Sequence, residues 1–293
     1  MASLKEVKSR IQSVTSTQQI TKAMKMVAAA KLRRAQNNIT QMRPYAAKLA
    51  GLLQNLSSQN SDDDNGSKYT AQREANNILV MVVTSDKGLC GAFNSNVFKA
   101  TVKHLQKNYE SQLKAGNVDI MPIGKKSLEY FTKRDYNVVS DYWDMFSPTS
   151  FETSAKAAEY AMESFSNGKY DKVEIIYNEF KNVATQLLQV EPFLPVTPSE
   201  ESATSSFEVD YIFQPSREEI VTDLIPKSLK VQVFKAILDS NAAEHGARMT
   251  AMDQATDNAG ELLKELRLTY NRTRQAAITK EILEIVGGAE ALG

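Results

Sequence analysis

The chain has 293 residues, with 35 Lys plus Arg against 35 Asp plus Glu, so its formal net charge is zero. Hydrophobic residues make up 42% and charged residues 24%, which excludes wholesale disorder and fibrous, low-complexity chains. The single cysteine excludes an intrachain disulfide, and one cysteine with two histidines cannot complete a Cys/His zinc site.

The charge is distributed unevenly along the chain. Residues 1–48 hold ten Lys or Arg and one acid, Glu6, which gives this segment a charge of +9 and leaves −9 on the rest. A solvated helix face normally mixes both signs, so this basic segment predicts an acidic partner. It lacks the apolar core of a signal peptide, and no apolar run reaches the roughly 18–20 residues of a membrane helix. We therefore expect the chain to meet a membrane only through partners.

The basic segment begins a long helix. Steps of three and four residues from Leu4 to Leu56 find apolar residues at 13 of 16 positions, a repeat typical of a coiled coil. Such a helix would be about 80 Å long, and Pro44 should kink it. The polar exceptions are clustered at Gln18, Thr21 and Lys25. They indicate that the seam faces something other than an apolar partner there.

An Asp-rich linker without periodicity follows over residues 59–76. An α/β domain is then predicted over residues 77–208, because short apolar strands alternate with helices. The predicted strands are 78–83, 119–123, 172–177 and 186–191, and the predicted helices are 94–107, 125–133 and 150–167. A Pro- and Ser-rich stretch follows from residue 192. The alternation predicts a largely parallel sheet covered by helices on both faces.

The helical pattern returns after Pro215, in a C-terminal segment assigned to residues 209–293 with Ser216 as its N-cap. From Leu238 to Tyr270, eight of ten positions in the three-four stepping are apolar. Beyond Tyr270 the phase slips, which predicts a straighter or unpaired helix end that projects past its partner. The predicted fold class is α/β, with a long antiparallel coiled coil of the N-terminal (1–58) and C-terminal helices and an inserted Rossmann-like α/β domain.

Catalytic motifs are sparse. Residues 85–91 (SDKGLCG) follow a strand as a phosphate-binding turn would, and residues 124–127 (GKKS) match the end of a Walker A loop. A complete GxGxxG or GxxxxGK[ST] is absent, so we interpret these glycines as needed for tight turns. Cys90 could act as a nucleophile with His104 as its base, but a small buried thiol is the commoner role at such a position. We predict no catalytic residue, no cofactor and no metal.

Two function classes stay open on the residues alone. A basic coiled-coil protein could bind nucleic acid, with an affinity that falls steeply with salt. Against this, Tyr45 is the only aromatic residue of the basic segment, and no nucleic-acid-binding motif is present. A small α/β enzyme with helical arms is the other class, and it lacks a coherent catalytic set. His245 lies on the apolar seam of the second helix, where we expect a packed, hydrogen-bonded side chain.

Several blocks of sequence resemble the γ subunit of F-type ATP synthase, in the right order and over essentially the full length. They are residues 20–32 (ITKAMKMVAAAKL), 84–94 (TSDKGLCGAFN), 245–262 (HGARMTAMDQATDNAGEL) and 270–281 (YNRTRQAAITKE). The most specific piece is residues 278–284 (ITKEILE), followed by residues 288–291 (GAEA), which matches the C-terminal signature of that family.

The resemblance implies the central rotor shaft of the F1 sector, without an active site of its own. Such a shaft couples proton translocation through the membrane sector to ATP synthesis at the β subunits by rotation. The implied partners are the hexamer of α and β subunits, the ε subunit and the ring of c subunits, and no nucleic acid is among them. The implied location is peripheral, on the cytoplasmic face of a bacterial plasma (inner) membrane, with membrane association only through the Fo sector.

The resemblance also implies which residues touch the α/β stator. Arg274 and Gln275 match residues that hydrogen-bond a loop of a β subunit, with Arg272 as a neighbouring cation. The cations of the first helix are expected to face acidic loops of the β subunits. The full expected contact set is Met24, Lys25, Lys31, Arg33, Arg34, Arg272, Arg274, Gln275, Thr279 and Glu281. The plant-chloroplast insert with its cysteine pair is missing, so thiol switching is not expected.

Overall fold

The structure, a computed structural model, describes residues 3–58, 68–146, 149–196 and 217–290, without the side chains of residues 50, 53–58, 217–222 and 290. Its residues form two compact units. Unit 1 comprises Met1–Ala29 and Arg248–Gly293, and unit 2 comprises Ala30–Ala247. Most of the predicted linker, the stretch after residue 196 and the proposed N-cap Ser216 lie outside the described residues. The predicted domain boundaries therefore stay predictions.

The N-terminal helix α1 (Leu4–Ser58) has the predicted extent and continues through Pro44. Its described seam residues are buried or half-buried, as the three-four stepping predicted. In unit 1 the buried ones are Val7, Thr21 and Ala28, and in unit 2 they are Leu32, Ala35, Ile39 and Leu49. The side chains of Leu53 and Leu56 lie outside the described residues.

A five-stranded sheet forms the centre of unit 2, in the order β3-β2-β1-β4-β5. Its strands are β1 (Ile78–Val83), β2 (Val118–Ile123), β3 (Asn137–Val138), β4 (Lys172–Phe180) and β5 (Gln186–Leu194). All neighbours are parallel except β4 and β5, which are antiparallel. The prediction of a largely parallel sheet is therefore confirmed. Strand β5 extends three residues beyond the predicted strand 186–191, into the Pro- and Ser-rich stretch, because Pro192 and Leu194 pair with β4.

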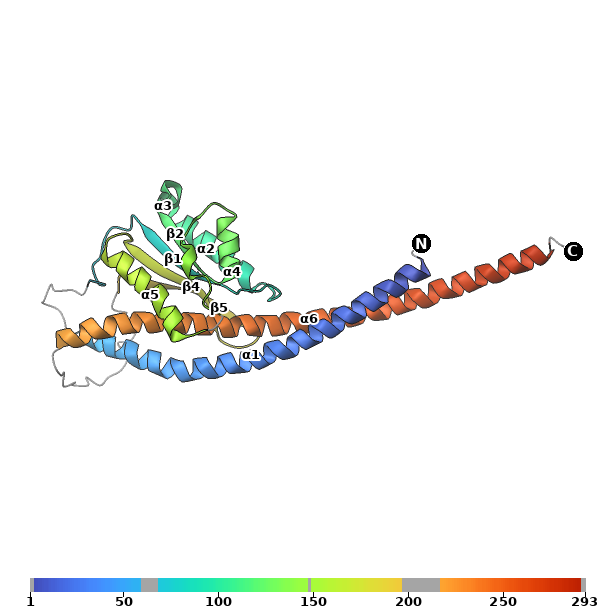
Figure 1. Cartoon of the computed structure of the whole chain (residues 1–293), viewed down its shortest axis with the longest axis horizontal. Coiled ribbons are helices and arrows are strands. Elements are labelled where there is room, and N and C mark those ends of the chain that lie inside the picture. The colour runs from blue at the N-terminus through green and yellow to red at the C-terminus, as the bar shows by residue number, and fades with distance from the viewer. Residues whose placement is uncertain (1–2, 59–67, 147–148, 197–216, 291–293) are drawn as a thin grey trace. The chain divides into compact units, whose positions relative to one another are not determined.

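Helices cover both faces of the sheet, as predicted (Figure 1). On one face, α2 (Phe93–Asn108) and α4 (Lys125–Thr132) bury side chains such as Leu105 and Phe131 against the even-numbered residues of β1. On the other face, α5 (Phe151–Ser166) buries a run of small residues, among them Ala157 and Ala161. The short helices α3 (Glu110–Ala115) and η1 (Ser140–Tyr142) were not predicted.

The C-terminal helix α6 (Arg217–Glu290) has a different role in each unit. In unit 2 it covers the sheet beside α5 and buries Ile225, Leu229, Val233, Ala236 and Ile237 in the same core (Figure 1). In unit 1 it buries the predicted seam residues Met252, Ala259, Leu263 and Leu266. Beyond Tyr270 most described side chains are exposed, so this end of the helix is uncovered within the chain.

Candidate functional site

Five polar side chains meet inside the coiled coil of unit 1, and we call them the polar layer: Gln18, Thr21, Lys25, Asp253 and Thr256. The ammonium of Lys25 forms an ion pair with Asp253. The two threonine hydroxyl oxygens lie 2.8 Å apart. The amide of Gln18 donates to the backbone oxygen of Thr256 at 3.4 Å. The seam at the polar exceptions of α1 thus faces polar groups of α6.

These contacts change the surroundings expected for Lys25. The expected contact of Lys25 with the stator stays a prediction, and within the chain its ammonium contacts Asp253. Sequence reasoning missed Asp253 because 228 residues separate the two partners. Half of each side chain stays accessible, with 40% of Lys25 and 48% of Asp253 exposed, so the pair can still meet a partner. Met24, beside it, is half-buried.

The other predicted contact residues are exposed. Lys31, Arg33 and Arg34 lie on the solvent side of α1 in unit 2. On α6 the exposed members of the set are Arg272, Arg274, Gln275, Thr279 and Glu281. The Thr279 hydroxyl donates to the Gln275 backbone oxygen at 2.9 Å, a bond within one helical turn.

Apolar side chains accompany the exposed polar ones at the end of α6. Ile282 is 54% exposed and Ile285 is 71% exposed, and Ile278, Leu283 and Val286 are also among the exposed large apolar residues. A group of exposed apolar side chains on one helix end is typical of an interaction site. Sequence reasoning located this segment through the phase slip after Tyr270.

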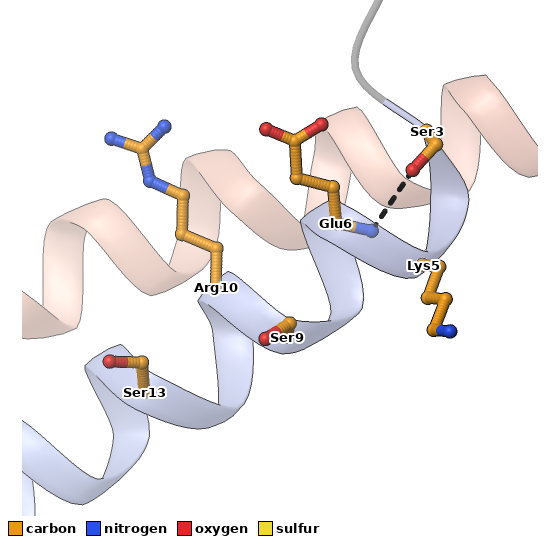
Figure 2. Close-up of a pocket in the computed structure, with 6 residues that line it drawn as sticks. All are labelled: Ser3, Lys5, Glu6, Ser9, Arg10 and Ser13. Carbon is orange, nitrogen blue, oxygen red and sulfur yellow. Dashed lines mark hydrogen bonds between the residues drawn. The ribbon is translucent and has the colours of Figure 1, made fainter.

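The start of α1 carries a shallow, open hollow (Figure 2). It is lined by Ser3, Lys5, Glu6, Ser9, Arg10 and Ser13. The Ser3 hydroxyl accepts a hydrogen bond from the Glu6 backbone N–H at 3.3 Å, so Ser3 caps the helix. Because the hollow is open and its lining comes from one stretch of chain, it offers no enclosed ligand site.

The GKKS segment forms the turn between β2 and the start of α4. Here the chain satisfies the helix N-terminus with its own hydrogen bonds. At the start of α4, the N–H groups of Lys125, Lys126 and Ser127 donate to the Asp86 carboxylate, the Ser85 backbone oxygen and the Thr84 hydroxyl. These are the donors that a phosphate would need. The GKKS segment therefore has no free helix N-terminus to offer a nucleotide.

Two backbone segments approach closely at the same turn. Gly124 has a φ of +108°, and a Cβ at this position would lie 2.2 Å from the Thr84 carbonyl oxygen. Only glycine fits there, which confirms that this glycine serves a tight strand-to-helix turn.

The candidate catalytic pair of Cys90 and His104 is not formed. Cys90 is buried, with its sulfur 3.3 Å from the Asn94 side-chain amide. Both ring nitrogens of His104 contact other groups, the Glu174 carboxylate at 2.6 Å and the Asn108 amide at 2.9 Å. His104 therefore cannot serve as the base for Cys90 in this arrangement.

Within the described parts of the chain, no group of three or more His, Cys, Asp or Glu side chains is placed to hold a metal ion. None of the described helices carries an apolar stretch sufficient to cross a membrane.

The fold and the exposed helix end define a class of protein: a coiled coil of two terminal helices with an α/β domain inserted between them. The model of the ATP synthase family matches residues 3–292. The ATP synthase gamma chain of Cytophaga hutchinsonii is 58% identical over 294 residues, covering 100% of this chain and 99% of that one. The gamma chain of Christiangramia forsetii is 55% identical with the same coverage. The chain therefore belongs to the ATP synthase gamma chain family.

Solved structures share the fold. A chain of the Euglena gracilis mitochondrial ATP synthase, solved by cryo-EM as OSCP/F1/c-ring in rotational state 3, gives a TM-score of 0.65 at 24% identity. The likeness covers 99% of this chain and 94% of that one. A chain of the central stalk and c-ring of the Tetrahymena thermophila enzyme gives 0.56 at 24% identity, covering 80% and 99%.

Proposed function

We propose that the chain is the rotating central shaft of an F-type ATP synthase. The observation that carries the proposal is the full-length similarity to ATP synthase gamma chains, at 58% and 55% identity for two of them. In this role it couples ion flow through a membrane sector to ATP synthesis in a surrounding stator. In this proposal the chain itself takes part in no bond-making step. In support, the helix N-terminus of its GKKS segment is occupied by the chain's own hydrogen bonds.

The partners in this proposal are a hexamer of α and β subunits, an ε subunit and a ring of c subunits. The coiled coil of unit 1 would lie inside the hexamer, with the exposed apolar residues of the α6 end in a bearing of stator side chains. The exposed cations Lys31, Arg33 and Arg34 would face acidic loops of the β subunits. Their attraction falls slowly with distance, which suits a shaft that must turn past successive subunits without locking.

The proposed location follows from the same role. The close relatives are bacterial, so we place the chain on the cytoplasmic face of a plasma membrane, attached through the membrane sector. The driving role of protons is part of this proposal.

Reconstitution tests the proposal directly. The purified chain is combined with the α and β subunits of the same organism, and a fluorescent actin filament is attached to an exposed cysteine introduced into unit 2. We expect no ATPase activity from the chain alone and ATP-driven rotation of the filament in the complex. Steady ATP turnover with a motionless filament would refute the rotor role. Failure of the chain to copurify with α and β would refute the assembly.

A further inference from the structure

The polar layer departs from what the rest of the coiled coil buries. Thr21 is 8% exposed, and the neighbouring buried positions of unit 1 are apolar, among them Ala28, Met252 and Ala259. Burying hydroxyl and amide groups between helices costs free energy unless each finds a partner, and apolar replacements would pack without that cost. Stability alone therefore does not explain why these residues stand in the seam.

Three contacts of the layer cross from α1 to α6 at one axial level: Gln18 to the Thr256 backbone, Thr21 to Thr256, and Lys25 to Asp253. The Thr21 hydroxyl donates to the Gln18 backbone oxygen at 3.0 Å and accepts from Thr256. Gln18 crosses to the backbone of α6, where Gly260 leaves room for its amide. A Cβ on Gly260 would lie 3.0 Å from the Gln18 amide nitrogen.

A shift by one heptad removes the three contacts between the helices, while each threonine hydroxyl keeps a backbone acceptor in its own helix, Gln18 for Thr21 and Met252 for Thr256. Apolar seam residues attract without direction, so a slip of seven residues restores apolar contacts and moves the helices by about 10 Å. After such a slip Thr21 would face Met249 or Leu263 in place of Thr256, and Lys25 would face Gly246 or Gly260 in place of Asp253. The side chains of methionine, leucine and glycine would replace neither the hydroxyl contact between the helices nor the carboxylate that pairs with Lys25.

We propose that the polar layer sets the axial register of α1 against α6 at the expense of some stability. Single polar positions in other coiled coils specify register in this way. The consequence for function rests on the proposed rotor role. The register fixes the axial offset between Met24 on α1 and Arg272 and Arg274 on α6, and a slip of about 10 Å would exceed the reach of any hydrogen bond to the stator.

Spin-label distances in the full-length chain test the register. Labels are placed on cysteines at Arg10 of α1 and Glu284 of α6, both exposed in unit 1, in a background in which Cys90 is replaced by alanine. Arg10 lies level with Leu268 if the Lys25–Asp253 pairing is extended along the helices. The two labels are therefore separated by roughly 25 Å along the axis, and a heptad slip changes this by about 10 Å.

The test variant replaces the layer with apolar residues: Q18L/T21V/K25M/D253L/T256V. We expect a single distance population in the parent chain and two or more populations, about 10 Å apart, in the variant. We also expect its thermal unfolding midpoint to rise. The control T21S/T256S keeps both hydroxyls and should keep one population.

Two outcomes would overturn the proposal. One is a single, unshifted distance in the apolar variant, which would mean that the remaining contacts hold the register, among them the apolar seam and the Arg43–Asp239 pair of unit 2. The other is a lowered unfolding midpoint with an unshifted distance, which would make the layer a stabilising element. Neither outcome depends on rotation, so failure of the register inference and failure of the rotor proposal are observed separately.

Discussion

The Arg43 guanidinium on α1 donates to the buried carboxylate of Asp239 on α6 at 2.9 Å. The same guanidinium donates to the backbone oxygen of Phe180, at the end of β4, at 2.8 Å. One side chain thus joins both long helices and the sheet within unit 2. The Asp239 side chain is fully buried, and among the described residues its second oxygen, Oδ2, has no hydrogen-bond partner.

Replacing the two members of this pair should have unequal effects. Burial raises the pKa of Asp239 above its usual range, against the lowering effect of the hydrogen bond and charge of Arg43. The charged carboxylate therefore destabilises the folded state at neutral pH. The variant D239N keeps a hydrogen-bond acceptor and should either change the free energy of unfolding by less than about 1 kcal/mol or increase it. R43M leaves the buried Asp239 without its ion-pair partner and should lower the free energy of unfolding by about 2–3 kcal/mol.

Urea denaturation at several pH values checks this prediction. An acid whose pKa is raised on folding loses stability as pH rises through the interval between its unfolded and folded pKa values. That loss should be absent in D239N. In the double variant R43M/D239N part of the R43M cost should be recovered. A D239N cost larger than that of R43M would contradict this account.

Gly124 should be the least replaceable glycine of the α/β domain. In G124A the methyl group would meet the Thr84 carbonyl at 2.2 Å, and the backbone at a φ of +108° is strained for any L side chain. We expect a loss above about 4 kcal/mol or failure to fold. The matched control is G116A, where φ is +77° and no atom lies within 4 Å of the added carbon. It should cost about 1–2 kcal/mol, measured by urea denaturation.

Glu174 should make the stability of the α/β domain depend on pH. Burial tends to raise its pKa, but hydrogen bonds from Tyr109 and His104 and the charge of Lys172 outweigh burial and hold the pKa below the usual 4.5. A lowered pKa contributes stability above the unfolded value, and this is lost as pH falls through the folded value. The difference in free energy of unfolding between the parent chain and E174Q should therefore be large at about pH 6 and should shrink as the pH falls below 4.5.

The control for Glu174 is the exposed pair of Glu110 and Lys114. E110Q should leave the unfolding midpoint nearly unchanged across the same pH range, because solvent screens such a pair. If the difference in free energy of unfolding between the parent chain and E174Q stays constant with pH, the lowered pKa of Glu174 is not its cause.

The exposed end of α6 should matter for assembly and not for folding. I282S/I285S changes two side chains that are 54% and 71% exposed, so the free energy of unfolding of the isolated chain should change by less than about 0.5 kcal/mol. Assembly with α and β subunits, followed by size-exclusion chromatography, should be weakened. L263S is the control, because Leu263 is 5% exposed and its loss should lower the unfolding midpoint. Normal assembly of I282S/I285S would remove this surface from the proposed bearing.

Salt dependence should reveal the role of the basic face of α1. In K31Q/R33Q/R34Q, three exposed cations are lost, and the rate of association with α and β subunits should fall at low salt. The difference should narrow at high salt, where screening acts on both forms. Rates measured by stopped-flow fluorescence at two ionic strengths check this, and an equal deficit at both would argue against long-range attraction.

Periodicity explains what the sequence could predict. The seam from Leu4 and the apolar strand 78–83 are local patterns, and both are confirmed. The packing of Ile225 and Val233 against the sheet was missed, because an apolar stripe does not reveal whether a helix or a sheet covers it. The partners of Lys25 and Arg43 were missed for a related reason: Asp253 and Asp239 are distant in sequence, and no local pattern pairs them.

The contact between Gly124 and Thr84 has a mechanical consequence. A crevice that opens around a ligand gives a sheet domain compliance, since its two sides must separate and close again. Here the strand ends are joined through Thr84, Ser85 and Asp86 to the first turn of α4. A torque applied to such a domain would store less energy in elastic deformation. A larger share of each rotary step would therefore be transmitted through the domain.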